Sequence, residues 1–472
     1  MVSSNSKTFN HNLWNIKLKE KGKLKDIFLK AKEEDVVLVE ILPLVQAFGF
    51  QVKINNINRE IIIEQKEGED LSCLIDSNAQ EILRYIDKNE KEIIDTSLNI
   101  HRYAEKGNQE FKSSQLLVDK LKKHGFEVEH GLDGIKSGKV VKMDTAFKAI
   151  LRGKSQGPTI YIMLEYDALP IGHACGHNLI ASSGLAAAIG LSKLMTEIPG
   201  TLVVIGTPAE DGGDIRGKEP LLKRGHFQGA DIVFITHPGN FWTDYASFLA
   251  VNGGIITYQG VPSHAAVAPD KGINALKAAY LTLNAIDALR EHILPESRIH
   301  AIISEGGMAP NIVPEKARID IRVRSTNTTY IIDLMEKIER AAKGASYAMG
   351  VQVNISWRGI QPSSINVLSL NELILSNVEY FKVTPVIRKE KIIGSSDLSF
   401  ISQEVPTVNL FFKISDTAAL HTYEFMKAAA SPEGQEAMLI SGKVLALSAY
   451  QLFVNPEKVK EIIREFKMIK NI

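Results

Sequence analysis

The segment Glu165-Tyr166-Asp167-Ala168-Leu169-Pro170-Ile171-Gly172-His173-Ala174-Cys175-Gly176-His177-Asn178 is the most informative part of the sequence, because it holds two carboxylates, two histidines and a thiol. An apolar run (159–164) precedes it and small residues (179–194) follow it, which predicts a strand and then a helix. Open α/β sheets bind ligands at the carboxyl ends of such strands. Cys175 and His177 can face one point, and thiolate with imidazole is a typical zinc ligand pair. The structural alternative is a buried cysteine beside a capping histidine.

The composition is that of an ordinary soluble protein. The 472 residues suggest about three domains, and 44% hydrophobic with 23% charged residues allow large cores. Lys+Arg and Asp+Glu both number 55, so the chain has no net charge that would favour binding to nucleic acid or to a membrane surface. Having only Cys73 and Cys175 argues against a disulfide framework. Without a run of about 18 apolar residues or an apolar signal segment, we expect a cytoplasmic protein.

Residues 1–75 are predicted to form a small α+β extension with an accessory module and no catalytic part. Residues 1–30 are polar and lysine-rich and are expected to be a loose arm. Apolar runs after them predict a strand at Val36–Val39, a helix at Ile41–Phe48, and two strands at Gln51–Ile54 and Ile61–Ile63 separated by an Asn-rich turn.

Residues 76–252 and 363–472 are predicted to form one discontinuous catalytic domain. A long helix is expected from Asn78 to Arg102, and another from Glu110 to His124 with Gly125 as its C-cap. Apolar strands then alternate with helices, a pattern typical of a mainly parallel sheet. The expected strands are 127–129, 145–150, 159–164, 201–206, 232–235 and 407–414, and the expected helices are 179–194, 218–224, 367–381, 431–453 and 457–470.

Residues 253–362 follow another order and are predicted to form an inserted domain. Strand-like runs at 255–259, 299–304, 318–324 and 351–357 combine with helical runs at 273–292 and 330–349. The order β-α-β-β-α-β is the ferredoxin-like arrangement. The predicted fold class is therefore α/β, with a parallel-sheet domain interrupted by a ferredoxin-like domain.

Four apolar strands each lead to side chains with useful chemistry. Neighbouring strand ends in a parallel sheet lie about 5 Å apart, so these side chains can converge on a metal. Taken singly, each has a structural alternative, such as a solvated loop pair, a strand terminator or a surface histidine. The groups are Cys175 with His177, Glu210 with Asp211, His237, and His421.

Several motifs in this order resemble the dinuclear zinc aminoacylase and carboxypeptidase family. The resemblance points to its branch of β-alanyl dipeptidases, p-aminobenzoyl-glutamate hydrolase and indole-acetyl-amino-acid hydrolases. It spans roughly Ile94 to Phe453 and implies a homodimer formed through the inserted dimerisation or lid domain. The motifs are Glu165–Pro170, Gly172–Asn178, Thr207–Asp211, Ser263–Ala266, Ala309–Pro314, Gly394–Asp397 and Leu420–Thr422.

The resemblance implies two divalent cations sharing the Cys175 thiolate, with zinc expected and manganese or cobalt as alternatives. Glu210 would be the general base that takes a proton from the attacking water and gives it to the leaving amine. Asp167 would orient a metal-binding imidazole. The remaining implied ligands are His177, Asp211, His237 and His421.

The resemblance also assigns residues of the inserted domain. His264 would reach the partner's active site and polarise the scissile carbonyl, although it could also be an ordinary loop histidine. Asn311 and Arg324 would hold the substrate's backbone or carboxylate, and Arg322 on the same strand face is an alternative to Arg324.

One departure bears on the metal site. Members of the family that the sequence resembles usually carry Glu-Glu where this chain has Glu210-Asp211. The Asp211 carboxylate therefore reaches about 1.5 Å less far, which puts metal affinity at that position in question.

The predicted function is metal-dependent hydrolysis of the amide bond in N-acyl amino acids or small dipeptide-like substrates, using metal-activated water. One alternative is a dipeptidase of the β-alanyl type. An alternative of another class is a non-catalytic dimeric ligand-binding protein whose metal site is impaired. A serine hydrolase is disfavoured, because the segment 181–184 (Ala-Ser-Ser-Gly) lacks the Gly-x-Ser-x-Gly elbow.

Overall fold

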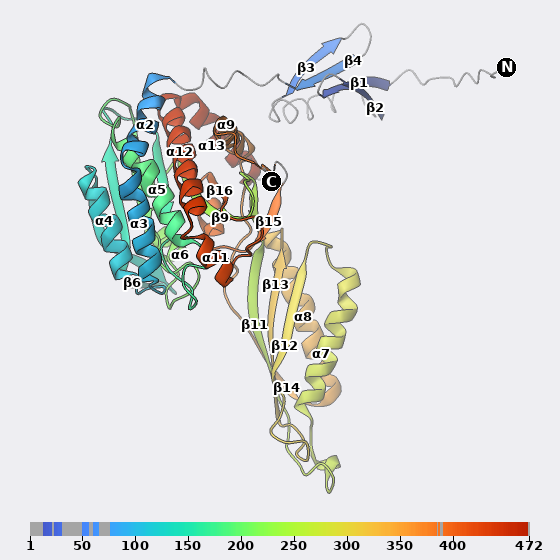
Figure 1. Cartoon of the computed structure of the whole chain (residues 1–472). Coiled ribbons are helices and arrows are strands. Elements are labelled where there is room, and N and C mark those ends of the chain that lie inside the picture. Colours follow the sequence, from blue (N-terminus) through green and yellow to red (C-terminus); the bar gives the residue numbers. More distant parts are fainter. Residues whose placement is uncertain are drawn as a thin grey trace, which may run out of the picture. The chain divides into compact units, whose positions relative to one another are not determined.

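A computed structural model describes residues 13–20, 23–30, 50–55, 60–65 and 76–470, apart from 385, 388 and 389. The chain divides into two compact units, Met1–Gln80 and Glu81–Ile472. Figure 1 shows the elements of both units in sequence colours.

The first unit contains a four-stranded sheet in the order β2-β1-β4-β3. Strand β1 pairs antiparallel with β2 and parallel with β4, and β3 pairs antiparallel with β4. The strands are β1 (Leu13–Glu20), β2 (Lys23–Lys30), β3 (Phe50–Asn55) and β4 (Glu60–Gln65).

The predictions made for this unit are confirmed in part. The loose arm predicted over residues 1–30 is wrong where β1 and β2 form. The alternation of Trp14, Ile16 and Leu18 with polar residues is a strand signal that outweighs the lysine-rich composition. The two strands around the Asn-rich turn are confirmed as β3 and β4. The runs Val36–Val39 and Ile41–Phe48 lie outside the described residues.

The second unit contains a six-stranded sheet in the order β16-β9-β7-β8-β6-β5. Strands β16, β9, β7 and β8 are parallel, and β6 runs antiparallel to β8 and β5. The predicted mainly parallel sheet is therefore confirmed, with an antiparallel hairpin at one edge. The strands are β5 (Glu127–Lys136), β6 (Lys139–Arg152), β7 (Thr159–Leu164), β8 (Thr201–Gly206), β9 (Ile232–Gly239) and β16 (Thr407–Lys413).

Helices cover this sheet, and the most deeply buried is α5 (His177–Ser192). A Cβ at Gly184 would lie 2.2 Å from Leu164 Cδ2 of β7, so the glycine lets α5 approach the sheet closely. The other helices are α2 (Ser77–Lys88), α3 (Glu90–Tyr103), α4 (Phe111–Lys123), α6 (Lys218–Arg224), α9 (Leu368–Tyr380), α10 (Leu398–Ser402), α11 (Tyr423–Ala428), α12 (Pro432–Val454) and α13 (Pro456–Lys470).

The single helix predicted from Asn78 to Arg102 is wrong, because α2 and α3 are separated at Asn89. The Asn89 side chain donates to the Tyr85 carbonyl oxygen (2.8 Å), a local bond that competes with helix continuation.

Helix α12 is the one described helix that is long and apolar enough to cross a membrane by length and composition. Inside this fold, 78% of its apolar window is buried, and it packs against α5. A core position therefore accounts for its composition.

The inserted segment forms a four-stranded antiparallel sheet in the order β12-β13-β11-β14. Helices α7 and α8 share one hydrophobic core with this sheet, so the predicted ferredoxin-like arrangement is confirmed. The elements are β11 (Ala250–Gln259), α7 (Ala275–Leu289), β12 (Arg298–Glu305), β13 (Lys316–Ser325), α8 (Thr328–Met349) and β14 (Gln352–Trp357).

A half-buried acidic group on α9, Glu372, should make stability depend on pH. Burial raises the pKa of Glu372 to about 7, and the nearby Glu465 and Glu461 add to this effect while Lys458 opposes it. The folded state thus holds this proton more tightly than the unfolded chain, so the proton's stabilising contribution is lost as pH rises from about 4.5 through 7. We expect Glu372→Gln to raise the melting temperature more at pH 8 than at pH 5.

Thermal unfolding at both pH values measures this effect. Glu436→Gln on α12, where the side chain is exposed, controls for the loss of one negative charge. An equal change at both pH values for Glu372→Gln would refute the prediction.

Candidate metal centre

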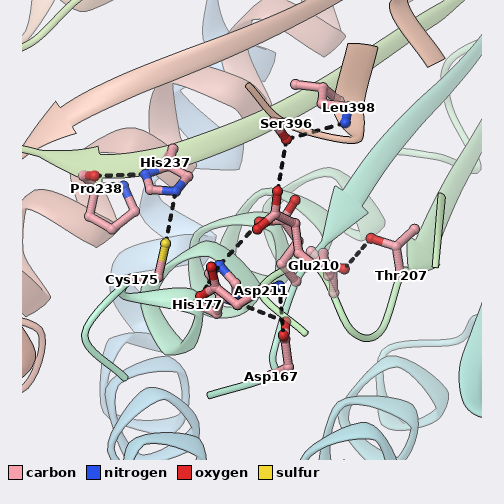
Figure 2. A network of polar contacts seen from close by, with 12 residues as sticks. Asp167, Cys175, His177, Thr207, Glu210, Asp211, His237, Pro238, Ser396 and Leu398 are labelled. Carbon is pink, nitrogen blue, oxygen red and sulfur yellow. Dashed lines mark hydrogen bonds and ion pairs between the residues drawn. The ribbon is translucent and has the colours of Figure 1, made fainter. Parts of the chain in front are cut away.

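The predicted donor residues converge at one edge of the six-stranded sheet, and Figure 2 shows four of them, Cys175, His177, Asp211 and His237. They follow or end the neighbouring parallel strands β7, β8, β9 and β16, whose carboxyl ends meet at this edge. We call the five predicted ligands the donor cluster: Cys175, His177, Asp211, His237 and His421.

Cys175 and His177 are placed by the turn into α5. Gly176 between them has a φ of 76°, and a Cβ there would lie 2.4 Å from Pro238 Cγ, so only glycine suits the position. The Cys175 sulfur lies 3.5 Å from His237 Nε2. The His237 ring stacks on Phe411, with ring centroids 4.8 Å apart, and this contact fixes its orientation.

Asp167 links two members of the donor cluster. One carboxylate oxygen lies 2.8 Å from His177 Nδ1, and the other accepts the Asp211 backbone N–H at 3.0 Å. Burial would raise the pKa of Asp167, but the charge and hydrogen bond of His177 outweigh it and hold that pKa low. An ionised Asp167 thus keeps the other imidazole nitrogen, Nε2, aimed at the cluster.

The donor atoms fall into groups that could each hold an ion. Within each group the ligand atoms lie within 4.8 Å of one another. One group is Cys175, His177 and His237, and another is Cys175, Asp211 and His421. These two groups use all five predicted ligands and share the Cys175 sulfur. A third group joins Glu210 to His177 and Asp211.

The chemistry of the cluster fits a cation. His177 Nε2 and Asp211 Oδ2 are buried 3.6 Å apart, and neither has a hydrogen-bond partner among the described residues. Leaving such groups unpaired is costly, and a cation would satisfy both. Burial lowers the pKa of His237 to about 3, which keeps its imidazole neutral and its lone pair available. Burial raises the pKa of the Cys175 thiol, and a bound cation would restore the thiolate.

Asp211 reaches the cluster despite its short side chain. Its carboxylate lies 3.6 Å from His177 Nε2 and 3.9 Å from His421 Nε2. The loop before it turns at Ala209, whose φ of 60° lies in the left-handed region. The Ala209 N–H donates to the buried Glu110 carboxylate at 2.9 Å. This turn and the Asp167 bond bring the Asp211 backbone inward.

His421 completes the cluster from the loop that follows the last strand, β16. Its φ of 66° is left-handed, and its backbone N–H donates to the Ala174 carbonyl at 2.9 Å. The side chain is 58% exposed, so His421 borders the open side of the site.

Glu210, the predicted general base, lies beside the cluster. Its carboxylate accepts a hydrogen bond from the Ser396 hydroxyl at 2.9 Å. Burial raises its pKa to about 7, and the nearby Glu165 adds to this while Lys218 opposes it. A carboxyl with a pKa near neutrality can both accept and return a proton.

A buried charge network behind Glu210 was not predicted from the sequence. Lys218 is fully buried and forms ion pairs with Glu165, at 2.8 Å, and with Asp397. Burial would lower the pKa of Lys218, but these two carboxylates outweigh it and keep the lysine charged. Glu165 lies 3.6 Å from His177 Nε2, so the network borders the donor cluster.

Removing the charge of Lys218 should destabilise the protein strongly. Lys218→Met leaves Glu165 and Asp397 buried without their counter-charge, and breaking such a pair costs about 3–5 kcal/mol. The free energy of unfolding by urea measures this loss. Lys223→Met on the same helix breaks the exposed ion pair with Glu219 and should cost less than about 0.5 kcal/mol. Equal losses in the two variants would contradict the expected role of the network.

The predicted residues of the inserted domain are not brought to the cluster within this subunit. His264 and Asn311 are exposed neighbours, because the Ala265 N–H donates to the Asn311 carbonyl at 3.0 Å. Among the described residues, neither bonds to a member of the donor cluster. Arg324 Nη1 donates instead to Ser395 Oγ at 2.9 Å, next to the serine that contacts Glu210.

The chain is similar to known peptidases and amidohydrolases in sequence and in fold. A family model described as a peptidase dimerisation domain matches residues 251–349. Human Xaa-Arg dipeptidase is 35% identical over 65% of this chain and 72% of its own length. One of the p-aminobenzoyl-glutamate hydrolase chains of Escherichia coli is 24% identical over 83% of this chain and 96% of its own length. A dinuclear metal-binding peptidase of the M20 family from Bacillus subtilis has a similar fold, with a TM-score of 0.62, 19% identity, and coverage of 78% and 99% of the two chains.

Proposed function

Because the chain belongs to the M20 peptidase family, and is therefore a hydrolase, we propose that it cleaves the amide bond of dipeptides or N-acyl amino acids at a dinuclear metal centre. The observation that carries this proposal is the pair of three-donor groups that share the Cys175 sulfur. The family assignment made from the sequence motifs is confirmed. The thiolate and imidazole donors favour zinc, with manganese or cobalt as alternatives.

The donor cluster would hold the two cations through its five side chains. When bound, the cations would supply positive charge that polarises the scissile carbonyl and acidifies the attacking water. Asp167 keeps His177 and the Asp211 backbone in position for this binding.

Glu210 then moves the proton. Its carboxylate is held by the Ser396 hydroxyl and lies in one three-donor group with His177 and Asp211. From this place it can take a proton from the attacking water and deliver it to the leaving amine. The raised pKa of Glu210, about 7, suits both steps.

The inserted domain would complete the site across a homodimer. Its match to a peptidase dimerisation domain supports this assembly. His264 is exposed and makes no contact with the donor cluster of its own subunit among the described residues. In a dimer, His264 of one subunit could stabilise the negative charge that develops on the substrate carbonyl in the other. Asn311, beside His264, and Arg324 would hold the substrate.

A substrate panel with metal-free and metal-loaded protein tests the proposal. The panel compares β-alanyl-lysine and similar dipeptides with N-acetyl amino acids. We expect hydrolysis to be lost on chelation and regained when zinc, manganese or cobalt is restored. Hydrolysis that survives complete removal of metal would overturn the proposed centre. Failure to bind two cations, together with absence of hydrolysis, would instead favour the non-catalytic ligand-binding protein with an impaired metal site.

A further inference from the structure

The open face of the inserted sheet carries a groove of about 670 Å³ lined by arginines. We call it the basic groove. The charged and titratable side chains that line it are His300, Arg318, Asp320, Arg322, Arg324 and Arg358. Four guanidinium groups therefore face one carboxylate.

This face is formed by the alternation of buried apolar residues with charged residues along strand β13. Ala317, Ile319, Ile321 and Val323 are buried in the core with α7 and α8. Side chains of alternate residues point to opposite faces of a strand, so the charged residues of 318–324 share the open face. The row from Arg318 to Arg324 spans about 20 Å at the usual rise of a strand, longer than a single amino acid.

The one carboxylate that lines the groove, that of Asp320, already pairs with an arginine of the groove. Arg318 donates to Asp320 at 2.7 Å through Nη2 and at 3.2 Å through Nε. Arg322 faces Gly253 on β11 and His300 on β12. Arg358 lies over the same glycine, where an added Cβ would be 3.6 Å from its Cδ. In the part of the chain that the structure describes, neither Arg322 nor Arg358 forms an ion pair.

The groove ends beside the candidate active site. Arg324 lines the groove and donates to Ser395 Oγ at 2.9 Å. The next residue, Ser396, donates to the predicted general base Glu210 at 2.9 Å. Burial and the neighbouring charge of Arg322 both lower the pKa of Arg324, so the positive charges of these two arginines repel each other. An anion between them would relieve this repulsion.

We propose that the basic groove binds additional carboxylates of the substrate's leaving group, beyond the one held by Arg324. Arg322 and Arg358 are the binding residues, with His300 at the rim. The inference rests on the proposed hydrolase function and specifies its substrate class. Leaving groups with two or more carboxylates are favoured. A leaving arginine is disfavoured, because it would bring a further guanidinium into a groove that already holds four.

Steady-state kinetics on matched substrates tests the groove. With one acyl group, the leaving groups are Gln, Glu, Glu-γ-Glu and Arg, and the protein is the full chain loaded with zinc. We expect kcat/KM for Glu and Glu-γ-Glu to exceed that for Gln by about tenfold or more, as for charge-assisted bonds, and Arg to be the poorest. The preference should weaken as salt is added.

Substitutions test which residues cause the preference for Glu over Gln as the leaving group. In the double variant Arg322→Gln/Arg358→Gln, kcat/KM for the Glu substrate divided by kcat/KM for the Gln substrate should fall towards one. Arg340→Gln, exposed on α8, removes one positive charge elsewhere and should keep the ratio. A wild-type protein that hydrolyses the Gln substrate without preferring Glu, or a preference that the double variant retains, overturns the groove proposal alone. Hydrolysis of none of the four substrates by the metal-loaded protein would contradict both proposals.

Discussion

Replacing Glu210 with glutamine is expected to lower kcat by about 10²–10⁴-fold, the usual contribution of a general base. The amide keeps the size of the side chain and can still contact Ser396, but it can neither accept nor return a proton. The metal content should stay near that of the wild-type protein, because the five ligands of the donor cluster are unchanged. Steady-state kinetics with metal analysis of the same samples measures both quantities.

The control for this variant is Glu219→Gln, a partly exposed carboxylate on α6. It removes the same charge near the site without touching the cluster, and its kcat should remain close to the wild-type value. If Glu210→Gln kept kcat within about tenfold of wild type while binding metal normally, the base would have to be another group.

Replacing Cys175 with alanine is expected to remove the donor that both three-residue groups share. Residues that only orient a metal ligand already change metal affinity by about 10–100-fold, so loss of a shared ligand should cost more than about 100-fold. Activity should fall with the bound metal. Metal analysis after dialysis against a weak chelator measures the loss.

Cys73→Ala removes the only other cysteine and is the control for this experiment. It should retain wild-type metal content and activity. A Cys175→Ala protein that still held two tightly bound cations would show that the thiolate is not the shared ligand.

Local sequence patterns were sufficient to predict the strands that carry the site. Apolar runs mark β7, β8, β9 and β16, and polar donors follow each run or end it. Since parallel strands end at one edge, the convergence of Cys175, Asp211, His237 and His421 follows from the pattern. The ferredoxin-like order also came from periodicity, because strand-like and helix-like hydrophobic patterns are clearly distinct along residues 253–362.

Contacts between distant segments could not be predicted in this way. Lys218 reads as an ordinary first-turn lysine of a surface helix, and only the fold brings it to Glu165 and Asp397. The reach of Asp211 depends on the left-handed backbone at Ala209 and on its bond to Glu110, 99 residues earlier. The individual roles of the site residues, the domain limits at 75, 252 and 362, and a cytoplasmic location stay predictions.

The most direct test of the dinuclear centre is a crystal structure of the zinc-loaded protein with anomalous diffraction at the zinc edge. The proposed dinuclear centre predicts two anomalous peaks, each about 2.3 Å from the Cys175 sulfur, with the imidazoles of His177, His237 and His421 among the remaining ligands. A single peak, or peaks that do not contact Cys175, would contradict it.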